Sequence, residues 1–355
     1  MNLFLCGALS NRVLAAEVTG CAPNAFVAYA LTDHAAVTVD GDGHAVPVVA
    51  PGQMASGLVL RDAGLEAVNR LRYYLAVFGM GLIEGVEHGF ATHPNAAGST
   101  FTETEPAFDL LIQMAGEIMA HHTRFPVEEM ASRLMPARMR AELWVKAQGE
   151  PANTDHNLAH DVKVETLHRP YMNFFAVREM DLRFRKQDGT MSPVVNRGGF
   201  LLGEASAVLP YDPVRDEVLL VQQFRVPIYM GGSNSPWVWE PVAGLVDPGE
   251  TPEQTAHREA MEEAGLTLHH LEALGPTHGS PGALSDRLNL FVGLTDLTRL
   301  VDASGVDSEG EDIRREICSF SALMDGIDSQ RFNILPLIAL GLWLARHRDR
   351  LRAMA

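Results

Sequence analysis

Residues 244–266 read GLVDPGETPEQTAHREAMEEAGL, and this stretch decides how the rest of the chain is interpreted. Thr251 can cap a helix whose first residue is Pro252, because proline is tolerated where no backbone N–H donor is needed. Gln254 lies three residues after the cap, which completes a capping box. The residues that follow are good helix formers until Gly265, which favours a left-handed stop. The stretch therefore predicts a loop followed by a capped helix.

Three glutamates, Glu259, Glu262 and Glu263, share one face of this predicted helix because they lie at i, i+3 and i+4. Carboxylates within one turn repel one another, so a cation should offset their charge. Mg2+ is commonly held by a few carboxylates together with substrate phosphates, so the cluster points to metal-assisted attack on a phosphate chain. The alternative is a solvated acidic helix with a surface pair between Arg258 and Glu262.

The spacing of the whole stretch favours the first interpretation. Gly244, five residues, Glu250, seven residues and then REAMEEAGL at 258–266 match the Nudix hydrolase signature at every fixed position. So many fixed positions seldom coincide by chance, unlike a lone glycine motif. The chain therefore resembles a Nudix hydrolase. The resemblance implies a loop–helix–loop unit that holds Mg2+, with Mn2+ as the alternative ion, and hydrolyses a nucleoside diphosphate linked to another group.

The acidic composition limits the partners of the chain. Its 355 residues suggest two domains, and a hydrophobic fraction of 46% is enough for ordinary packed cores. The net charge is −17, with 45 acidic residues against 28 lysines and arginines, which argues against a nucleic-acid partner because such binders need a basic surface. An acidic protein can still bind an anionic small molecule through local arginines and metal ions.

The cysteine count and the hydropathy pattern predict a cytoplasmic protein. Three cysteines fit free thiols in a reducing compartment better than a disulfide framework. The apolar N-terminus lacks a preceding basic residue and is soon interrupted by polar residues, so we expect no signal peptide. No segment has 18 uninterrupted apolar residues, so we expect no membrane span and no membrane partner.

Residues 1–150 and 158–355 are expected to form two domains, because the polar stretch GEPANTDHN at 149–157 is typical of a linker. The first domain should be β-rich. In the second, mixed strands with helices on both sides predict an α/β/α sandwich with a mixed sheet, so the chain belongs to the α/β (α+β) class.

Several elements of the first domain can be placed from local patterns. Pro136 should kink or split the helix expected at 127–146. The expected short strands cover 25–31, 36–39, 44–49 and 57–60, and the expected helices cover 65–77, 108–120 and 127–146.

The first 80 residues resemble the γ-glutamylcyclotransferase-like fold. Members open with a strand and a turn, here CGAL at 6–9, and later carry an Arg-Leu-Asp-x-Tyr-Glu type segment, here RLRYYL at 70–75. The family's acid–base glutamate would fall at Leu75, which cannot transfer a proton. The resemblance therefore implies a non-catalytic scaffold domain. The alternative is a pocket that still binds a small ligand at the Gly7–Leu9 turn.

The second domain resembles the ADP-ribose pyrophosphatases over nearly all of residues 160–350, and most closely the subgroup labelled as tellurite-resistance (TrgB-like) proteins. Pro281, fifteen positions after the signature, is a mark of this family. Asp286 departs from the pattern, because relatives commonly have glutamate there, and we leave it out of the catalytic set. The stretches that carry the resemblance are LPYDP at 209–213, VQQFR at 221–225, EPVAG at 240–244 and SPG at 280–282.

Position by position, the resemblance implies a metal site on the predicted helix. Glu259 and Glu263 would ligate Mg2+ together with the backbone carbonyl of Ala243. Glu262 is a weaker ligand candidate. Arg258 would orient these carboxylates, and we therefore place it with Glu263 among the catalytic residues.

The resemblance also implies substrate-binding residues outside the signature. Arg197 and Arg225 match arginines that grip the diphosphate, which suits the forked guanidinium group. The alternative for each is a surface ion pair. Phe174 or Phe175 matches an aromatic residue that stacks on adenine. The alternative for this pair is one ring in the core and one ring exposed.

A second acidic feature is DASGVDSEGEDIRRE at 302–316, which holds six carboxylates in fifteen residues. A charge run of this kind is usually a solvated loop. In the family this position carries the general base, which Glu309 matches, and a further metal ligand, which Glu311 matches. An acid beside bound metal ions can deprotonate a water that the metal has made acidic.

The leading hypothesis is Mg2+-dependent hydrolysis of ADP-ribose to AMP and ribose 5-phosphate. A second hypothesis keeps the hydrolase and changes the substrate to another nucleoside diphosphate derivative, such as a nucleotide sugar, NADH or FAD. A third is a ligand-sensing or scaffold protein that acts through residues 1–150. A homodimer is implied by the resemblance alone.

Overall fold

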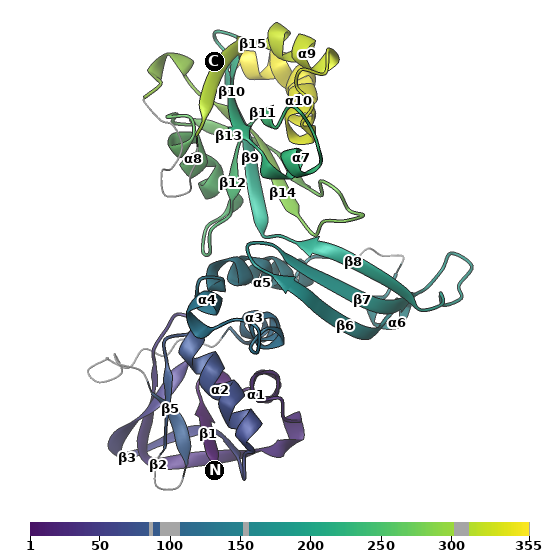
Figure 1. Cartoon of the computed structure of the whole chain (residues 1–355). Coiled ribbons are helices and arrows are strands. Elements are labelled where there is room, and N and C mark those ends of the chain that lie inside the picture. Colours follow the sequence, from purple (N-terminus) through teal and green to yellow (C-terminus); the bar gives the residue numbers. More distant parts are fainter. Residues whose placement is uncertain (85–87, 93–106, 152–155, 302–311, 355) are drawn as a thin grey trace. The chain divides into compact units, whose positions relative to one another are not determined.

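The computed structural model describes residues 1–84, 88–92, 107–151, 156–301 and 312–354. The chain forms two compact units, which we call the first unit (Met1–Gly198) and the second unit (Gly199–Ala355), and each is described by itself. Both combine helices with strands, as the predicted α/β (α+β) class requires (Figure 1).

The main sheet of the first unit is built around β1 (Leu3–Cys6), whose four residues are all buried. It runs antiparallel to β3 (Ala45–Leu60) and parallel to β5 (Gly89–Thr92). The strand order is β2-β3-β1-β5-β4, with β2 at Phe26–Thr38 and β4 at Gly81–Glu84. A central position suits β1, because a strand that is covered on both faces reads as a continuous apolar run.

The four short strands expected between residues 25 and 60 are wrong in their bounds, because β2 and β3 form one long hairpin. The polar interruption after Thr32 does not end β2. A bulge there places Asp33 at φ +56°, and its carboxylate accepts a hydrogen bond from Gly52 N at 2.9 Å. A bulge inserts an extra residue without ending the ladder, which explains why the local pattern suggested two strands.

The helices of the first unit cover its main sheet. The helices expected at 65–77 and 108–120 are confirmed as α2 (Leu65–Val77) and α3 (Phe108–Ala120). The third splits into α4 (Val127–Ala131) and α5 (Leu134–Gln148), and Pro136 lies in the first turn of α5, where its missing N–H costs nothing. α1 covers Arg12–Thr19. Leu75, at the position where the resembled family has its acid, is fully buried in the apolar core.

A separate three-stranded sheet completes the first unit. Its order is β6-β7-β8, with β6 at Val162–Met172, β7 at Ala176–Phe184 and β8 at Val195–Leu201, and the short α6 (Leu158–Asp161) precedes it. Most of β6 is exposed, but its last residue, Met172, lies in the same buried core as residues of α2, α3 and α5.

The second unit is a sandwich around a mixed seven-stranded sheet, as predicted. Figure 1 shows α8 on one side of this sheet and α9 and α10 on the other. Along β9, Ala207, Leu209 and Tyr211 pack in one core with α9 and α10, whereas Val208 packs in a second core with α8. This alternation buries both faces of the sheet. The helices are α7 (Val226–Met230), α8 (Pro252–Glu262), α9 (Phe320–Asp328) and α10 (Leu335–Arg352). The strands are β9 (Glu204–Asp212), β10 (Glu217–Phe224), β11 (Trp237–Glu240), β12 (Val242–Leu245), β13 (His270–Thr277), β14 (Arg287–Leu294) and β15 (Arg314–Ser319).

Strand β9 organises this sheet because it pairs on both edges. It runs parallel to β14 on one side and antiparallel to β12 and β10 on the other. Ala207 of β9 is opposite Ala243 of β12, which brings the end of β12 under α8. In the described residues, the helices do not combine the length and the apolar character that a membrane crossing requires.

Candidate active site

Helix α8 begins with the capping box that the sequence predicts. Thr251 Oγ1 accepts a hydrogen bond from Gln254 N at 3.3 Å, and Gln254 Oε1 accepts one from Thr251 N at 2.7 Å. The helix ends at Glu262, and Gly265 adopts the predicted left-handed conformation at φ +64°. These two ends fix the rotation of α8, which decides where its acidic face points.

The carboxylate of Glu259 lies against the backbone of β12 at Gly244. A Cβ atom placed on Gly244 would be 1.7 Å from Glu259 Oε1, far inside any allowed contact. Glycine is therefore needed at this position so that a charged oxygen can approach the main chain.

Glu263 is almost completely buried, at 1% exposure, and lies beside Ala243, the residue that precedes Gly244 in β12. Its Oε2 accepts a hydrogen bond from Ala243 N at 3.1 Å, and its Oε1 accepts one from the side-chain amide of Gln223. A buried carboxylate needs partners of this kind, because an ion without them is strongly disfavoured. Glu259 and Glu263 therefore meet two consecutive residues of β12.

Arg258 lies at the centre of the acidic face. Its guanidinium donates to both oxygens of Glu250, at 3.0 and 3.1 Å, and Nη1 donates to Glu259 at 2.7 Å and to Glu262 at 2.9 Å. Nη2 also donates to Leu245 O at 3.1 Å. Arg258 therefore donates hydrogen bonds to three carboxylates and to the end of β12 at once.

These bonds shift two pKa values in the expected directions. The hydrogen bonds that Arg258 donates to Glu250, followed by the negative charge of Glu259, raise the pKa of Arg258 above its ordinary value. Hydrogen bonding from Arg258 holds the pKa of Glu250 below its ordinary value. The pair with Glu262 that the surface-helix interpretation expects is present, but it is one of several contacts of Arg258.

The donor set at this site fits a hard divalent cation. Carboxylate and carbonyl oxygens are the ligands that Mg2+ prefers, and two carboxylates approach the backbone at Ala243 and Gly244. Within the described ranges, no three Asp, Glu, His or Cys side chains converge on a single point. Glu309 and Glu311, the predicted base and further ligand, lie outside the described residues.

The two predicted substrate arginines belong to different units. Arg225 follows β10 in the second unit and makes an ion pair with Glu240, with Nε at 2.7 Å and Nη2 at 2.6 Å from the carboxylate. Arg197 lies on β8 in the first unit, is exposed, and donates to the carbonyl of Asn196 at 2.7 Å.

Phe174 and Phe175 occupy the turn between β6 and β7 in the first unit. Both rings are exposed, at 52% and 38%, and they meet edge to face with their centroids 5.0 Å apart. The alternative of one core ring and one exposed ring is therefore wrong. The buried residues of this region are instead Met172, which ends β6, and Ala176, which begins β7.

Gln223 is the site residue that our sequence reasoning did not single out. It is 6% exposed, and its amide holds the buried carboxylate of Glu263. Leu219 and Val221 precede it at a spacing of two and face the core under α8. A polar residue that continues the buried phase of a strand is the signal that could have identified it.

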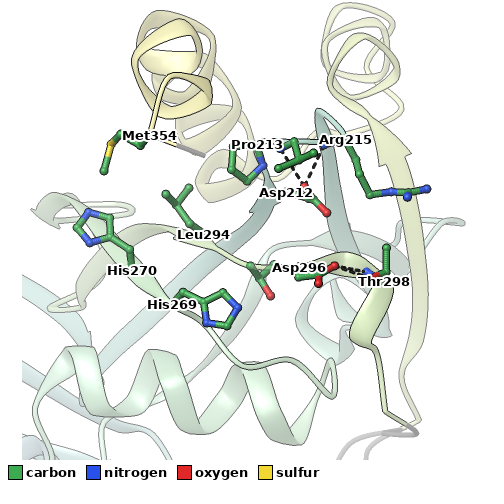
Figure 2. Close-up of a pocket in the computed structure, with 11 residues that line it drawn as sticks. Asp212, Pro213, Arg215, His269, His270, Leu294, Asp296, Thr298 and Met354 are labelled. Carbon is green, nitrogen blue, oxygen red and sulfur yellow. Dashed lines mark hydrogen bonds between the residues drawn. The ribbon is translucent and has the colours of Figure 1, made fainter.

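The sheet also carries an open cavity of roughly 610 Å3 at its opposite end (Figure 2). Asp212 is five residues along β9 from Ala207, so the cavity lies about 16 Å away along the strand. Asp212 accepts hydrogen bonds from Val214 N and Arg215 N at 3.0 Å, which closes the β9–β10 turn. The predicted site residues that the structure describes do not line this cavity.

Comparison with known proteins shows which family the chain belongs to. Residues 202–336 match the family described as NUDIX domain. ADP-ribose pyrophosphatase of Escherichia coli (strain K12) is 37% identical over 194 residues, which cover 54% of this chain and 92% of that protein. The chain belongs to the Nudix hydrolase family.

Two further relatives are named after two different substrates. ADP-ribose pyrophosphatase of Haemophilus influenzae is 34% identical over 175 residues, covering 49% of this chain and 79% of that protein. GDP-mannose pyrophosphatase of Pectobacterium atrosepticum is 35% identical over 129 residues, covering 36% of this chain and 65% of that protein.

The segment shared with the E. coli Nudix enzyme reaches into the first unit. A match over 54% of 355 residues spans about 192 residues, which is longer than the whole of Gly199–Ala355. Even if the match runs to the last residue, it includes the β6–β7 turn with Phe174 and Phe175. The β6–β7 turn therefore belongs to the first unit by packing and to the segment matched with the E. coli protein by sequence.

Proposed function

We propose that this Nudix enzyme hydrolyses ADP-ribose to AMP and ribose 5-phosphate with the help of Mg2+. The observation that carries the proposal is that two acidic side chains, Glu259 of α8 and Glu263 at its C-cap, meet two consecutive residues of β12, namely Gly244 and Ala243. The choice of ADP-ribose rests on the 37% identity to a pyrophosphatase of that substrate over 92% of its length.

The residues around β12 would hold the metal ion. We assign Glu259, Glu263 and the carbonyl of Ala243 as ligands, with Glu262 as the weaker candidate and Mn2+ as the alternative ion. When bound, Mg2+ neutralises charge on the diphosphate and lowers the pKa of a bound water. Arg258 orients the carboxylates through the hydrogen bonds described above, so it acts on the ligands and not on the phosphate.

Arginine side chains would bind the diphosphate. The Arg225 side chain is 38% exposed while it pairs with Glu240. Arginine binds phosphate through two parallel N–H donors, which suits this role. We assign Arg197 the same role on the basis of the family resemblance. Phe174 and Phe175, both exposed, are assigned to the adenine base.

The proton acceptor is assigned to the acidic loop. Glu309 is proposed as the general base that takes a proton from the attacking water, and Glu311 as a further ligand. Both assignments rest on the family resemblance, because the structure does not describe these residues.

A nucleotide sugar is the second candidate substrate, since a GDP-mannose pyrophosphatase is 35% identical over 129 residues. A panel of ADP-ribose, GDP-mannose, NADH and FAD in Mg2+, with identification of the phosphate products, separates the two. We expect the highest kcat/KM with ADP-ribose, and AMP and ribose 5-phosphate as products. A higher kcat/KM with another compound would reject ADP-ribose as the main substrate.

We also propose a homodimer and a cytoplasmic location, both from the family resemblance and the composition. The relation to the tellurite-resistance subgroup stays a prediction in the same way. Size-exclusion chromatography with light scattering tests the dimer directly, with a mass near twice 38.7 kDa expected.

A further inference from the structure

The turn that carries Phe174 and Phe175 is anchored in the helices of the first unit. The turn is closed by a hydrogen bond from Asn173 N to Phe175 O at 2.8 Å. On either side of it, Met172 is 1% exposed and Ala176 is 3% exposed. Met172 lies in the apolar core of the N-terminal helices and sheet, so the hairpin is buried on either side of its tip while the two aromatic residues of the tip are exposed.

A buried arginine ties this turn to two helices. Arg140 of α5 is 5% exposed, and its Nη1 donates to Phe174 O at 2.7 Å and to Asn173 O at 3.4 Å. Its Nε and Nη2 donate to the carboxylate of Glu117 on α3, the closer contact being 2.7 Å. One guanidinium therefore holds a helix on one edge and the backbone of the turn on the other.

Strand β7 joins the same network. Glu117, itself 3% exposed, also accepts a hydrogen bond from Arg178 Nη2 at 3.0 Å. A carboxylate with two arginine partners is well compensated, and the removal of a single partner from a buried pair is costly. The turn is therefore held by contacts that a flexible surface loop lacks.

Strand β6 also lies close to α3 just before the turn. A Cβ atom on Gly116 would be 2.6 Å from Arg169 Nη2, so the glycine leaves room for this side chain over the helix. Arg124 Nη1 donates to Pro170 O at 3.5 Å. Gly116 lies on α3, which also supplies Glu117, and Arg124 lies in the turn that follows this helix.

We propose that α3 and α5 of the first unit position the substrate-binding turn of the Nudix enzyme, with Arg140 and Glu117 as positioning residues. The network fixes the backbone of residues 173–175 so that the exposed rings are held ready for the nucleotide base. Ordering a turn before binding removes that cost from the binding step. This inference rests on the proposed function, and it gives the N-terminal helices a role in substrate affinity without any catalytic residue of their own.

The direct test compares two arginines of the same helix. Arg140→Ala removes the contact with the turn and leaves Glu117 paired with Arg178. Arg138→Ala is the matched control, since its guanidinium pairs with Asp42 and Glu142 and not with the turn. We expect Arg140→Ala to raise the KM for ADP-ribose roughly 5- to 20-fold with kcat nearly unchanged. Arg138→Ala should leave both constants close to wild type.

A double-mutant comparison shows whether Arg140 acts through the rings. Phe174→Ala combined with Phe175→Ala should raise KM, and Arg140→Ala in that background should raise it no further. If Arg140→Ala raised the KM in that background by the same factor as in the wild type, the proposal would be overturned, because Arg140 would then act independently of the two rings. An unchanged KM in the Phe174→Ala and Phe175→Ala variant would also overturn it, while hydrolysis of ADP-ribose by the wild type would still support the proposed function.

Hydrogen–deuterium exchange provides a readout that does not depend on the substrate. The peptide that covers residues 170–178 should exchange faster in Arg140→Ala than in Arg138→Ala or wild type. Unchanged exchange in Arg140→Ala would overturn the positioning role, whatever the activity of the wild type. Inactivity of the wild type on ADP-ribose would instead reject the proposed function alone. If Arg140→Ala does not fold, Arg140→Lys replaces it, because lysine keeps the charge and lacks the fork that reaches both partners.

Discussion

Glu259 Oε1 occupies the space where Gly244 would carry a side chain, 1.7 Å from the position of a Cβ atom. The position of the Glu259 carboxylate on α8 therefore depends on the absence of a side chain at Gly244 of β12. The first residue of the signature stretch is a glycine because the carboxylate fifteen positions later needs to touch the main chain there.

We predict that Gly244→Ala displaces the Glu259 carboxylate and weakens Mg2+ binding. The methyl group would meet a side-chain end that can rotate away, so the fold should survive. We expect the Mg2+ concentration for half-maximal activity to rise about tenfold or more, in the range found when ligand positioning is disturbed. Titration of activity with Mg2+ measures this. Gly41→Ala, where the added methyl meets open space, is the matched control and should change nothing. An unchanged Mg2+ dependence in Gly244→Ala would contradict the role given to Glu259.

Arg258→Lys should lower activity although it keeps the positive charge. Arg258 donates in parallel to both oxygens of Glu250 and separately to Glu259 and Glu262. A lysine ammonium cannot reproduce this planar fork, so the carboxylates should lose their orientation. We expect kcat to fall about 10- to 100-fold. Steady-state kinetics at saturating Mg2+ and the melting temperature are the measurements. A loss of stability with normal kcat would assign Arg258 a structural role only.

The ion pair between Glu272 of β13 and Arg350 of α10 should make stability depend on pH. Hydrogen bonding from Arg350 at 2.8 and 2.9 Å lowers the pKa of Glu272 to about 2. A carboxyl group whose pKa is lowered in the folded state stabilises the fold above its unfolded pKa, which is about 4.3, and loses that contribution as the pH falls towards 2.

Glu272→Gln should therefore destabilise the protein at pH 7 by about 1 kcal/mol or less, as is usual for a surface pair. The difference from wild type should shrink between pH 4.5 and pH 2. Urea unfolding at a series of pH values measures it, with Glu253→Gln, on the exposed side of α8, as the control. A difference that stays constant with pH would show that the pair does not contribute through its charge.

The sequence predicted the local features of the site well, because they depend on short-range physics. The Thr251 cap and the left-handed Gly265 both follow from the residues at the two ends of one helix. The same holds for α2 and α3, whose bounds follow from periodicity alone.

Features that depend on distant contacts were not predicted. The long β2–β3 hairpin depends on a bulge at Asp33 that a propensity argument interprets as a break. The insertion of Met172 into the N-terminal core depends on helices about 50 residues earlier in the chain. Gln223 has a detectable signal, a polar residue in a buried phase, but its partner Glu263 is 40 residues away. Such pairings are set by tertiary structure and not by local pattern.

The central claim is that the buried Glu263 carboxylate beside Ala243 supports Mg2+-dependent cleavage of a diphosphate. The most direct measurement is the rate of AMP formation from ADP-ribose by wild type, Glu263→Gln and the control Glu253→Gln, each with and without Mg2+. Glutamine has the same shape and keeps one oxygen that can accept the hydrogen bond from Ala243 N, while its NH2 group can donate to Gln223 once the Gln223 amide turns its oxygen towards it, so the fold should persist. The account predicts Mg2+-dependent AMP release by wild type and Glu253→Gln, and a fall of at least about 100-fold in Glu263→Gln. A folded Glu263→Gln variant with a near-normal rate would contradict it.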